Sequence, residues 1–178
     1  MKNILREIKL PYLIVGICII YLAVVMFIFR NPFVSEYELE AGDKLKIKSL
    51  LKQDVKASFL TEINEDITKT VGDHDIQVKA KGGTYTVTIH TVDTIKPKVS
   101  TKNATIYLND PVDPKTFVKS IKDQTNVKVT IQNKIDNTKT GKQKVQLLFV
   151  DDGGNKVKKE VTANIKKRYR RSKNQNTI

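Results

Sequence analysis

Several residue types that carry chemistry in proteins are scarce in this sequence. Its 178 residues include one cysteine, two histidines and no tryptophan. A single cysteine excludes an intramolecular disulfide and a cysteine-based zinc cluster. Hydrophobic residues make up 39% of the chain, which is below the share usual for globular domains and predicts small cores. The composition therefore specifies no reaction.

Positive charge is in excess, but it is unevenly distributed. The chain has 32 Lys and Arg against 19 Asp and Glu, a formal net charge of +13. Residues 1–30 contribute +3, and residues 31–95 subtract 3. Residues 96–165 contain 14 lysines and 7 acidic residues, and residues 166–178 contain six basic residues and no acid. A weakly acidic region is therefore followed by a basic region and a strongly basic segment.

An uncharged run of 20 residues, LPYLIVGICIIYLAVVMFIF, occupies 10–29. A helix of that length rises about 30 Å, which matches the hydrocarbon core of a bilayer. The run is apolar on every face and therefore predicts a single transmembrane α-helix rather than a buried core helix. A cleaved signal peptide is the main alternative, but the run is long, ends in bulky residues and has no A-x-A site.

The charges beside this run predict its orientation. Lys2, Arg6 and Lys9 precede the run, whereas acidic residues dominate the segment that follows it. Short cationic flanks stay in the cytoplasm. We therefore expect residues 1–9 in the cytoplasm, an uncleaved signal-anchor in the cell membrane, and all that follows a 30–34 linker outside the cell.

The region after the linker contains two similar copies of one pattern. Gly72 in the first copy corresponds to Gly141 in the second, 69 residues further on. The glycine pair at 82–83 has a counterpart in the second copy as well. The copies predict two domains, 35–95 and 96–165, followed by a basic disordered tail at 166–178.

Both copies have the pattern of β-strands. Apolar and polar residues alternate at 75–79 and 85–89, and the glycine pair between these segments predicts a hairpin. The second copy has corresponding strands at 144–150 and 156–165, with a turn between them. The sequence therefore predicts an all-β outer region of two tandem small β-sandwiches, preceded by the transmembrane α-helix.

Few residues are candidates for chemistry. Cys18 lies in the apolar run, so it is excluded as a nucleophile. His74, in a predicted turn, and His90, in a predicted strand, are interpreted as ordinary surface or edge histidines. The segment 151–155, DDGGN, offers oxygen ligands for Ca²⁺ but lacks the ligand number and terminal Glu of an EF-hand loop, so a hairpin turn is favoured. We therefore predict no catalytic, cofactor-binding or metal-binding residue and no enzymatic activity.

Four motifs in the outer region resemble the tandem bacterial immunoglobulin-like repeats of Gram-positive membrane-anchored surface proteins. They are DTIKP at 93–97, DPKTFV at 113–118, IDNTKTG at 135–141 and VDDGGNK at 150–156. The second copy matches clearly over 93–165, and the first, over 35–92, matches more weakly. The resemblance implies that both predicted sandwiches have an immunoglobulin-like fold and act as a stalk or spacer, and it implies no ligand.

The C-terminal segment is the strongest electrostatic signal. Its basic residues are Lys166, Lys167, Arg168, Arg170, Arg171 and Lys173. Outside a cell, the expected counterparts are polyanions such as phosphate-rich wall polymers. A solvated terminus that merely aids solubility is the alternative interpretation.

These observations predict a membrane-anchored surface protein that acts as a non-catalytic binding or spacer module at the cell envelope. The expected partners are an anionic cell-wall polymer or an acidic surface protein, without a cofactor and without nucleic acid. The alternatives are an accessory subunit of a secretion or conjugation machine, and the anchor and stalk of a surface enzyme that lost its catalytic domain. The sequence indicates no oligomeric state.

Overall fold

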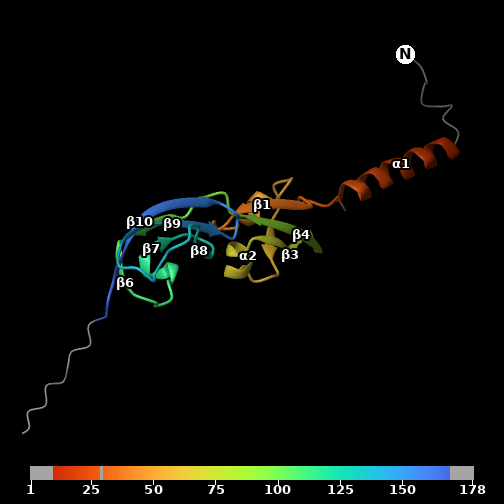
Figure 1. Ribbon diagram of the computed structural model, residues 1–178. Helices are drawn as coiled ribbons and strands as arrows, with labels where there is room; N and C mark the ends of the chain where they lie inside the picture. The colour runs from red at the N-terminus through yellow and green to blue at the C-terminus, as the bar shows by residue number, and fades with distance from the viewer. Residues whose placement is uncertain (1–9, 29, 169–178) are drawn as a thin grey trace, which may run out of the picture.

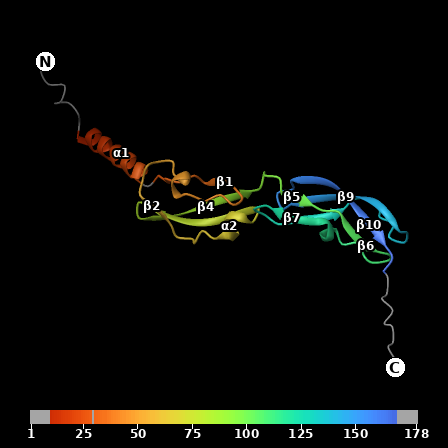
Figure 2. The ribbon, with the colours of Figure 1, turned by 90° about the vertical axis from the view of Figure 1, so that its left-hand side faces the viewer.

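The computed structural model describes residues 10–28 and 30–168. A helix, α1, is followed by two β-domains that lie one after the other along an elongated molecule (Figure 1, Figure 2). The helix stands apart from both β-domains in both views, and its apolar side chains are exposed.

The helix α1 (Leu10–Ile28) covers most of the apolar run. In the part of the chain that the structure describes, no helix is both long and apolar enough to cross a membrane. This finding contradicts the transmembrane α-helix and signal-anchor predicted over 10–29. It also contradicts the localisation built on them, with a cytoplasmic N-terminus and extracellular domains.

The first β-domain is built on a four-stranded sheet in the order β1-β4-β3-β2. β1 runs parallel to β4, and β3 is antiparallel to β4 and β2. The elements are β1 (Glu36–Glu40), η2 (Ile47–Leu50), β2 (Ala57–Phe59), α2 (Glu65–Lys69), β3 (Gly72–Ala80) and β4 (Gly83–Val92). The described strands of this domain form one sheet. The second sheet of the predicted sandwich is absent from the described residues of this domain, and short helices and loops take its place.

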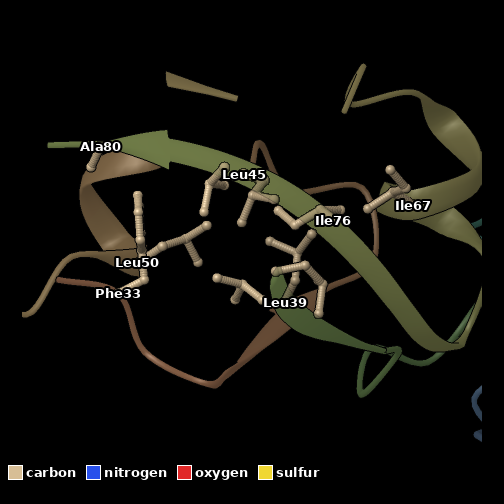
Figure 3. Packing of buried hydrophobic residues seen from close by; sticks show 10 residues of the cluster. Phe33, Leu39, Leu45, Leu50, Ile67, Ile76 and Ala80 are labelled. Atoms are coloured by element: carbon tan, nitrogen blue, oxygen red, sulfur yellow. The ribbon is translucent and has the colours of Figure 1, made fainter. Parts of the chain in front are cut away.

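The core of the first β-domain lies on one face of this sheet. Alternation along β3 and β4 buries Ile76 and Ile89 completely, as the period of two requires. Phe33 before β1, Leu39 in β1 and Leu50 in η2 pack against them (Figure 3). Phe33 is fully buried, so the packed domain begins inside the 30–34 segment that was assigned as a linker.

The second β-domain contains two sheets. The larger has the order β6-β10-β9-β8, and the smaller pairs β5 with β7. The elements are β5 (Lys98–Thr101), β6 (Ala104–Tyr107), η3 (Pro114–Phe117), β7 (Val118–Lys122), β8 (Val127–Ile131), β9 (Gly141–Asp151) and β10 (Lys156–Lys166). Val145, Leu147 and Phe149 of β9 are buried against Phe117 of η3. The smaller sheet contributes half-buried apolar side chains to the same core, which makes this domain a small sandwich.

The two four-stranded sheets have the same strand order and the same directions. In each, the first strand of the domain's larger sheet runs parallel to its last strand, β1 beside β4 and β6 beside β10. In each, the last two strands form an antiparallel hairpin, and one further strand pairs with the outer side of that hairpin. The internal similarity seen in the sequence therefore corresponds to a repeated topology.

The junction between the two β-domains is held by hydrogen bonds on both sides. Thr94 donates from its backbone N and its Oγ1 to the carboxylate of Glu40 in β1, at 2.8 Å and 2.9 Å. The preceding residue, Asp93, accepts at its backbone oxygen from Nδ2 of Asn155 in the β9–β10 turn, at 2.8 Å. The junction segment is thus bonded to both domains.

Candidate functional site

A groove lined by lysines lies between the two sheets of the second β-domain. Lys98 of β5, Lys122 of β7 and Lys159 of β10 line it, together with Ser100 and Ser120. The groove encloses about 430 Å³, and its remaining lining residues are proline and valine. Since no acidic residue lines it, this groove is a concave surface of one charge sign.

The strand register places two of these lysines directly opposite each other. Lys98 in β5 is the pairing partner of Lys122 in β7. Like charges at opposed positions of an antiparallel pair destabilise the pair. All three groove lysines are exposed, and none forms an ion pair with a described residue. A bound anion would offset this repulsion.

Not every basic residue of this domain is available to a ligand. Lys144 of β9 forms an ion pair with Glu160 of β10 at 2.8 Å between Nζ and Oε1. The hydrogen bond from Lys144 to Glu160, together with the negative charge of that carboxylate, raises the pKa of Lys144 above 10.5. The groove lysines differ from Lys144 because none of them forms an ion pair with a described carboxylate.

The structure describes three of the six basic residues predicted to bind polyanions. Lys166, Lys167 and Arg168 are exposed at the end of β10, whereas Arg170, Arg171 and Lys173 lie outside the described residues. Arg168 donates to Asp110 Oδ2 at 2.8 Å, and its guanidinium lies 5.0 Å from the ring centre of Tyr107. Part of the charge of this segment is therefore engaged within the domain.

The groove and the C-terminal segment lie at different places along β10. Lys159 and Lys166 are seven residues apart on this strand. At about 3.3 Å per residue, they are separated by roughly 23 Å. The structure therefore divides the positive charge between two places. The groove was missed in the sequence because its three lysines come from three separate strands.

The two histidines occupy the surface of the first β-domain. His90 Nδ1 lies 2.6 Å from Asp73 Oδ1, and its Nε2 lies 3.1 Å from Glu36 Oε2. The hydrogen bond with Asp73, followed by that with Glu36, raises the pKa of His90 above its ordinary value of 6.5. His74 lies in β3 rather than in the predicted turn, because the ladder with β4 extends past it, and its Nε2 is 2.8 Å from Thr70 O.

His90→Gln is expected to remove a pH-dependent part of the stability of the first β-domain. Because the folded-state pKa is raised, the contribution of His90 is fully present below about pH 6.5 and is lost as the pH rises through the folded pKa. We therefore expect the difference in Tm between the wild type and His90→Gln, measured by circular dichroism, to shrink as the pH rises from about 5 to 8. Asp73→Asn should weaken the same dependence. Identical pH profiles for wild type and His90→Gln would contradict this assignment.

The turn at 151–155 has the predicted hairpin geometry. Gly154 N donates to Asp151 O at 3.1 Å, and Asn155 N donates to Asp151 Oδ1 at 2.7 Å. The structure also brings two carboxylates from elsewhere, Asp93 and Asp123, next to Asp151. Sequence reasoning weighed the turn by itself and missed this group, since the other two residues are 28 or more positions away.

Comparison with known proteins assigns no family. No protein-family profile and no curated protein matches the chain. Among solved structures, a Rib domain from Streptococcus pyogenes is 17% identical with a TM-score of 0.35, over 38% of this chain and 90% of that one. Human mucin-like protocadherin EC1-2 is 11% identical with a TM-score of 0.32, over 75% and 96%. These neighbours are immunoglobulin-like or cadherin-type β-sandwich domains, and scores this low carry no argument about activity.

Proposed function

We propose that this chain is a non-catalytic binding and spacing module whose second β-domain binds a phosphate-rich anionic polymer. The lysine groove formed by Lys98, Lys122 and Lys159 is the observation that carries the proposal. Three cations from three strands converge there, and two of them face each other in register without an ion pair to a described carboxylate. A bound anionic ligand would offset the repulsion between these lysines.

A polymer suits the groove better than a small anion. The ammonium group of lysine acts as a point charge with little geometric selectivity, so affinity grows with the number of phosphates contacted. Lys166 and Lys167 lie roughly 23 Å further along the same domain, within reach of one extended chain. A repeating polyanion can therefore engage the groove and the end of β10 together, as a multivalent ligand.

The spacing role rests on the arrangement of the two β-domains. They follow each other along the long direction of the molecule, and the junction segment is hydrogen-bonded to both (Figure 2). The immunoglobulin-like repeats that the sequence resembles are stalks or spacers in Gram-positive surface proteins. A stiff tandem of this kind would hold the lysine groove at a set distance from the first domain.

The absence of catalysis is part of the proposal. Among the described residues, His90 is held between two carboxylates on an exposed sheet face, and His74 is bonded to a backbone carbonyl. The described cysteine, Cys18, is exposed and belongs to α1, the helix that stands apart from both β-domains in Figure 1. Neither histidine is placed as a base beside a nucleophile, which is the arrangement that acyl-transfer chemistry requires.

Binding of inorganic polyphosphate to the full-length chain tests the proposal. We expect Lys98→Gln/Lys122→Gln/Lys159→Gln to weaken binding by about tenfold and to lower the salt slope by about 2, because phosphate contacts release counterions. The matched control, Lys115→Gln/Lys128→Gln/Lys134→Gln, removes the same charge from exposed positions outside the groove. Equal loss in both variants would mean that net charge alone governs binding and would overturn the groove assignment. Tighter binding to poly-glutamate than to polyphosphate would point instead to an acidic protein.

A further inference from the structure

Three carboxylates meet at the junction between the β-domains. Asp93 lies just after β4, Asp123 just after β7, and Asp151 at the end of β9. One carboxylate oxygen from each lies within 4.8 Å of the others. Asp93 is 6% exposed and Asp151 5% exposed, while Asp123 is half-buried. The three residues thus form a largely buried acidic group, called here the junction triad.

The hydrogen bonds to the junction triad come from neutral groups. Thr125 Oγ1 donates to Asp93 Oδ2 at 2.6 Å and also lies 3.1 Å from Asp123 Oδ1, which accepts in addition from Thr125 N at 2.9 Å. Asn155 N donates to Asp151 Oδ1 at 2.7 Å. Within the described residues, none of the three carboxylates forms an ion pair with Lys or Arg. Their negative charges are close together, and no ion pair neutralises them.

One oxygen of the triad is both buried and unpaired. Asp151 Oδ2 is shielded from solvent and has no hydrogen-bond partner among the described residues. A buried carboxylate oxygen without a partner is costly, because it has lost its hydration and gained nothing in exchange. In this position, beside two further carboxylates, it is the atom that a metal ion would satisfy.

We propose that the junction triad of Asp93, Asp123 and Asp151 binds a divalent cation, and that this cation is Ca²⁺. Carboxylate oxygens are hard ligands that suit Ca²⁺ and Mg²⁺. Two ligands on opposite sides of Ca²⁺ lie about 4.8 Å apart, against about 4.1 Å for Mg²⁺. The oxygens of the triad all lie within 4.8 Å of one another, so one Ca²⁺ can contact all three. Ca²⁺ also tolerates irregular coordination, which suits ligands from three separate segments, whereas Mg²⁺ demands a near-ideal octahedron. Water completes the coordination shell.

Two lysines of the polymer-binding groove lower the affinity of the triad for a cation. Lys98 and Lys122 line the same cavity of about 460 Å³ as Asp93 and Asp123. Their ammonium groups repel a cation without forming an ion pair to the triad, so they lower its affinity. Lys122→Gln is therefore expected to strengthen Ca²⁺ binding by several-fold, the opposite of its effect on the polymer.

A bound ion would stiffen the junction. Asp93 belongs to the segment between the domains, and its neighbour Thr94 is bonded to Glu40 of the first β-domain. Asp123 and Asp151 both belong to the second β-domain. One Ca²⁺ shared by the three would tie the connecting segment to the second domain, so that the angle between the domains is set by the ion.

Calorimetric titration of the chelator-treated full-length chain with CaCl₂ tests the site. We expect one Ca²⁺ per chain for the wild type and at least tenfold weaker binding for Asp123→Asn. Asn retains the acceptor for the bond from Thr125 N, so this variant keeps the local turn. The control is Asp152→Asn, which removes the adjacent carboxylate outside the triad and should bind as the wild type does. Absence of binding at about 10 mM CaCl₂, or equal binding by Asp123→Asn, would overturn the proposal.

The Tm gives a second test. Asp123→Asn should be more stable than the wild type without Ca²⁺, and it should lose the stabilisation that Ca²⁺ gives the wild type. In chelator, Asp123→Asn should raise the Tm by a few degrees, because it removes one of three mutually repelling charges. With Ca²⁺ added, the Tm of the wild type should rise and that of Asp123→Asn should not. A lower Tm for Asp123→Asn in chelator would show that the three carboxylates stabilise the junction without a cation, and it would refute the site.

Discussion

Phe33→Ala is expected to lower the free energy of unfolding of the first β-domain by about 3–5 kcal/mol. Phe33 is fully buried, and its ring centre lies 5.5 Å from that of Tyr85 in β4. The segment that carries it bridges to Leu51, and Val34 N donates to Leu50 O at 2.9 Å. Truncation removes a large apolar side chain and leaves a cavity in a core that is small to begin with.

Chemical denaturation of the full-length chain, with hydrogen exchange to assign the transition to a domain, measures this effect. The amides of β3 and β4 should lose protection, while those of β9 and β10 should keep it. Phe33→Leu retains most of the volume and serves as the control, with an expected loss of less than about 1.5 kcal/mol. If Phe33→Ala behaved like a surface substitution, residues 30–34 would be a linker after all.

Gly153→Ala is expected to destabilise the second β-domain by about 2–3 kcal/mol. A Cβ on Gly153 would overlap with the backbone oxygen of Asp93 and would lie 2.8 Å from the Cβ of Asp93. The obstacle is backbone and cannot rotate away. The β9–β10 turn would have to retreat from the junction, which would also break the bond between Asn155 Nδ2 and Asp93 O.

The neighbouring glycine provides a control with a different physical cause. Gly154 has a φ of +82°, and a Cβ there meets nothing within 4 Å. Gly154→Ala therefore incurs only left-handed backbone strain, about 1–2 kcal/mol. Urea denaturation of both variants, with hydrogen exchange at Thr94 and Ile95, separates the two effects. A loss for Gly153→Ala no larger than for Gly154→Ala would contradict the close approach of the turn to the junction.

Much of the β-structure was visible in the sequence. The alternation at 75–79 and 85–89 lies in β3 and β4, and the alternation buries the expected faces. The hairpin predicted from the glycine pair at 82–83 is present, but its turn is formed by Lys81 and Gly82, both with a positive φ, and Gly83 already belongs to β4. These features depend on turn residues and on the alternation of side chains along a strand, both of which can be recognised within a short segment of sequence. The two copies predicted two similar domains, whereas the strand order within each came only from the structure.

The candidate sites were far less visible. The lysines at 166–167 and the arginine after them attracted attention because they are adjacent in the sequence, yet Arg168 is partly engaged with Asp110. The groove depends on the pairing of Lys98 with Lys122, which is a matter of register between strands that are far apart in the sequence. A pattern of alternation shows which side chains share a face, but not which strand lies beside which.

The order of the parts could be predicted from the amino-acid sequence: an apolar helix, two related β-domains and an uneven distribution of charge. The folded structure was needed to show that Phe33 belongs to a core, that three lysines share a groove, and that Asp93, Asp123 and Asp151 meet at the junction. It also decided that the described helix is not long and apolar enough to cross a membrane. The physical reason is that local preferences act between neighbours in the chain, whereas burial and charge convergence depend on which distant segments pack together.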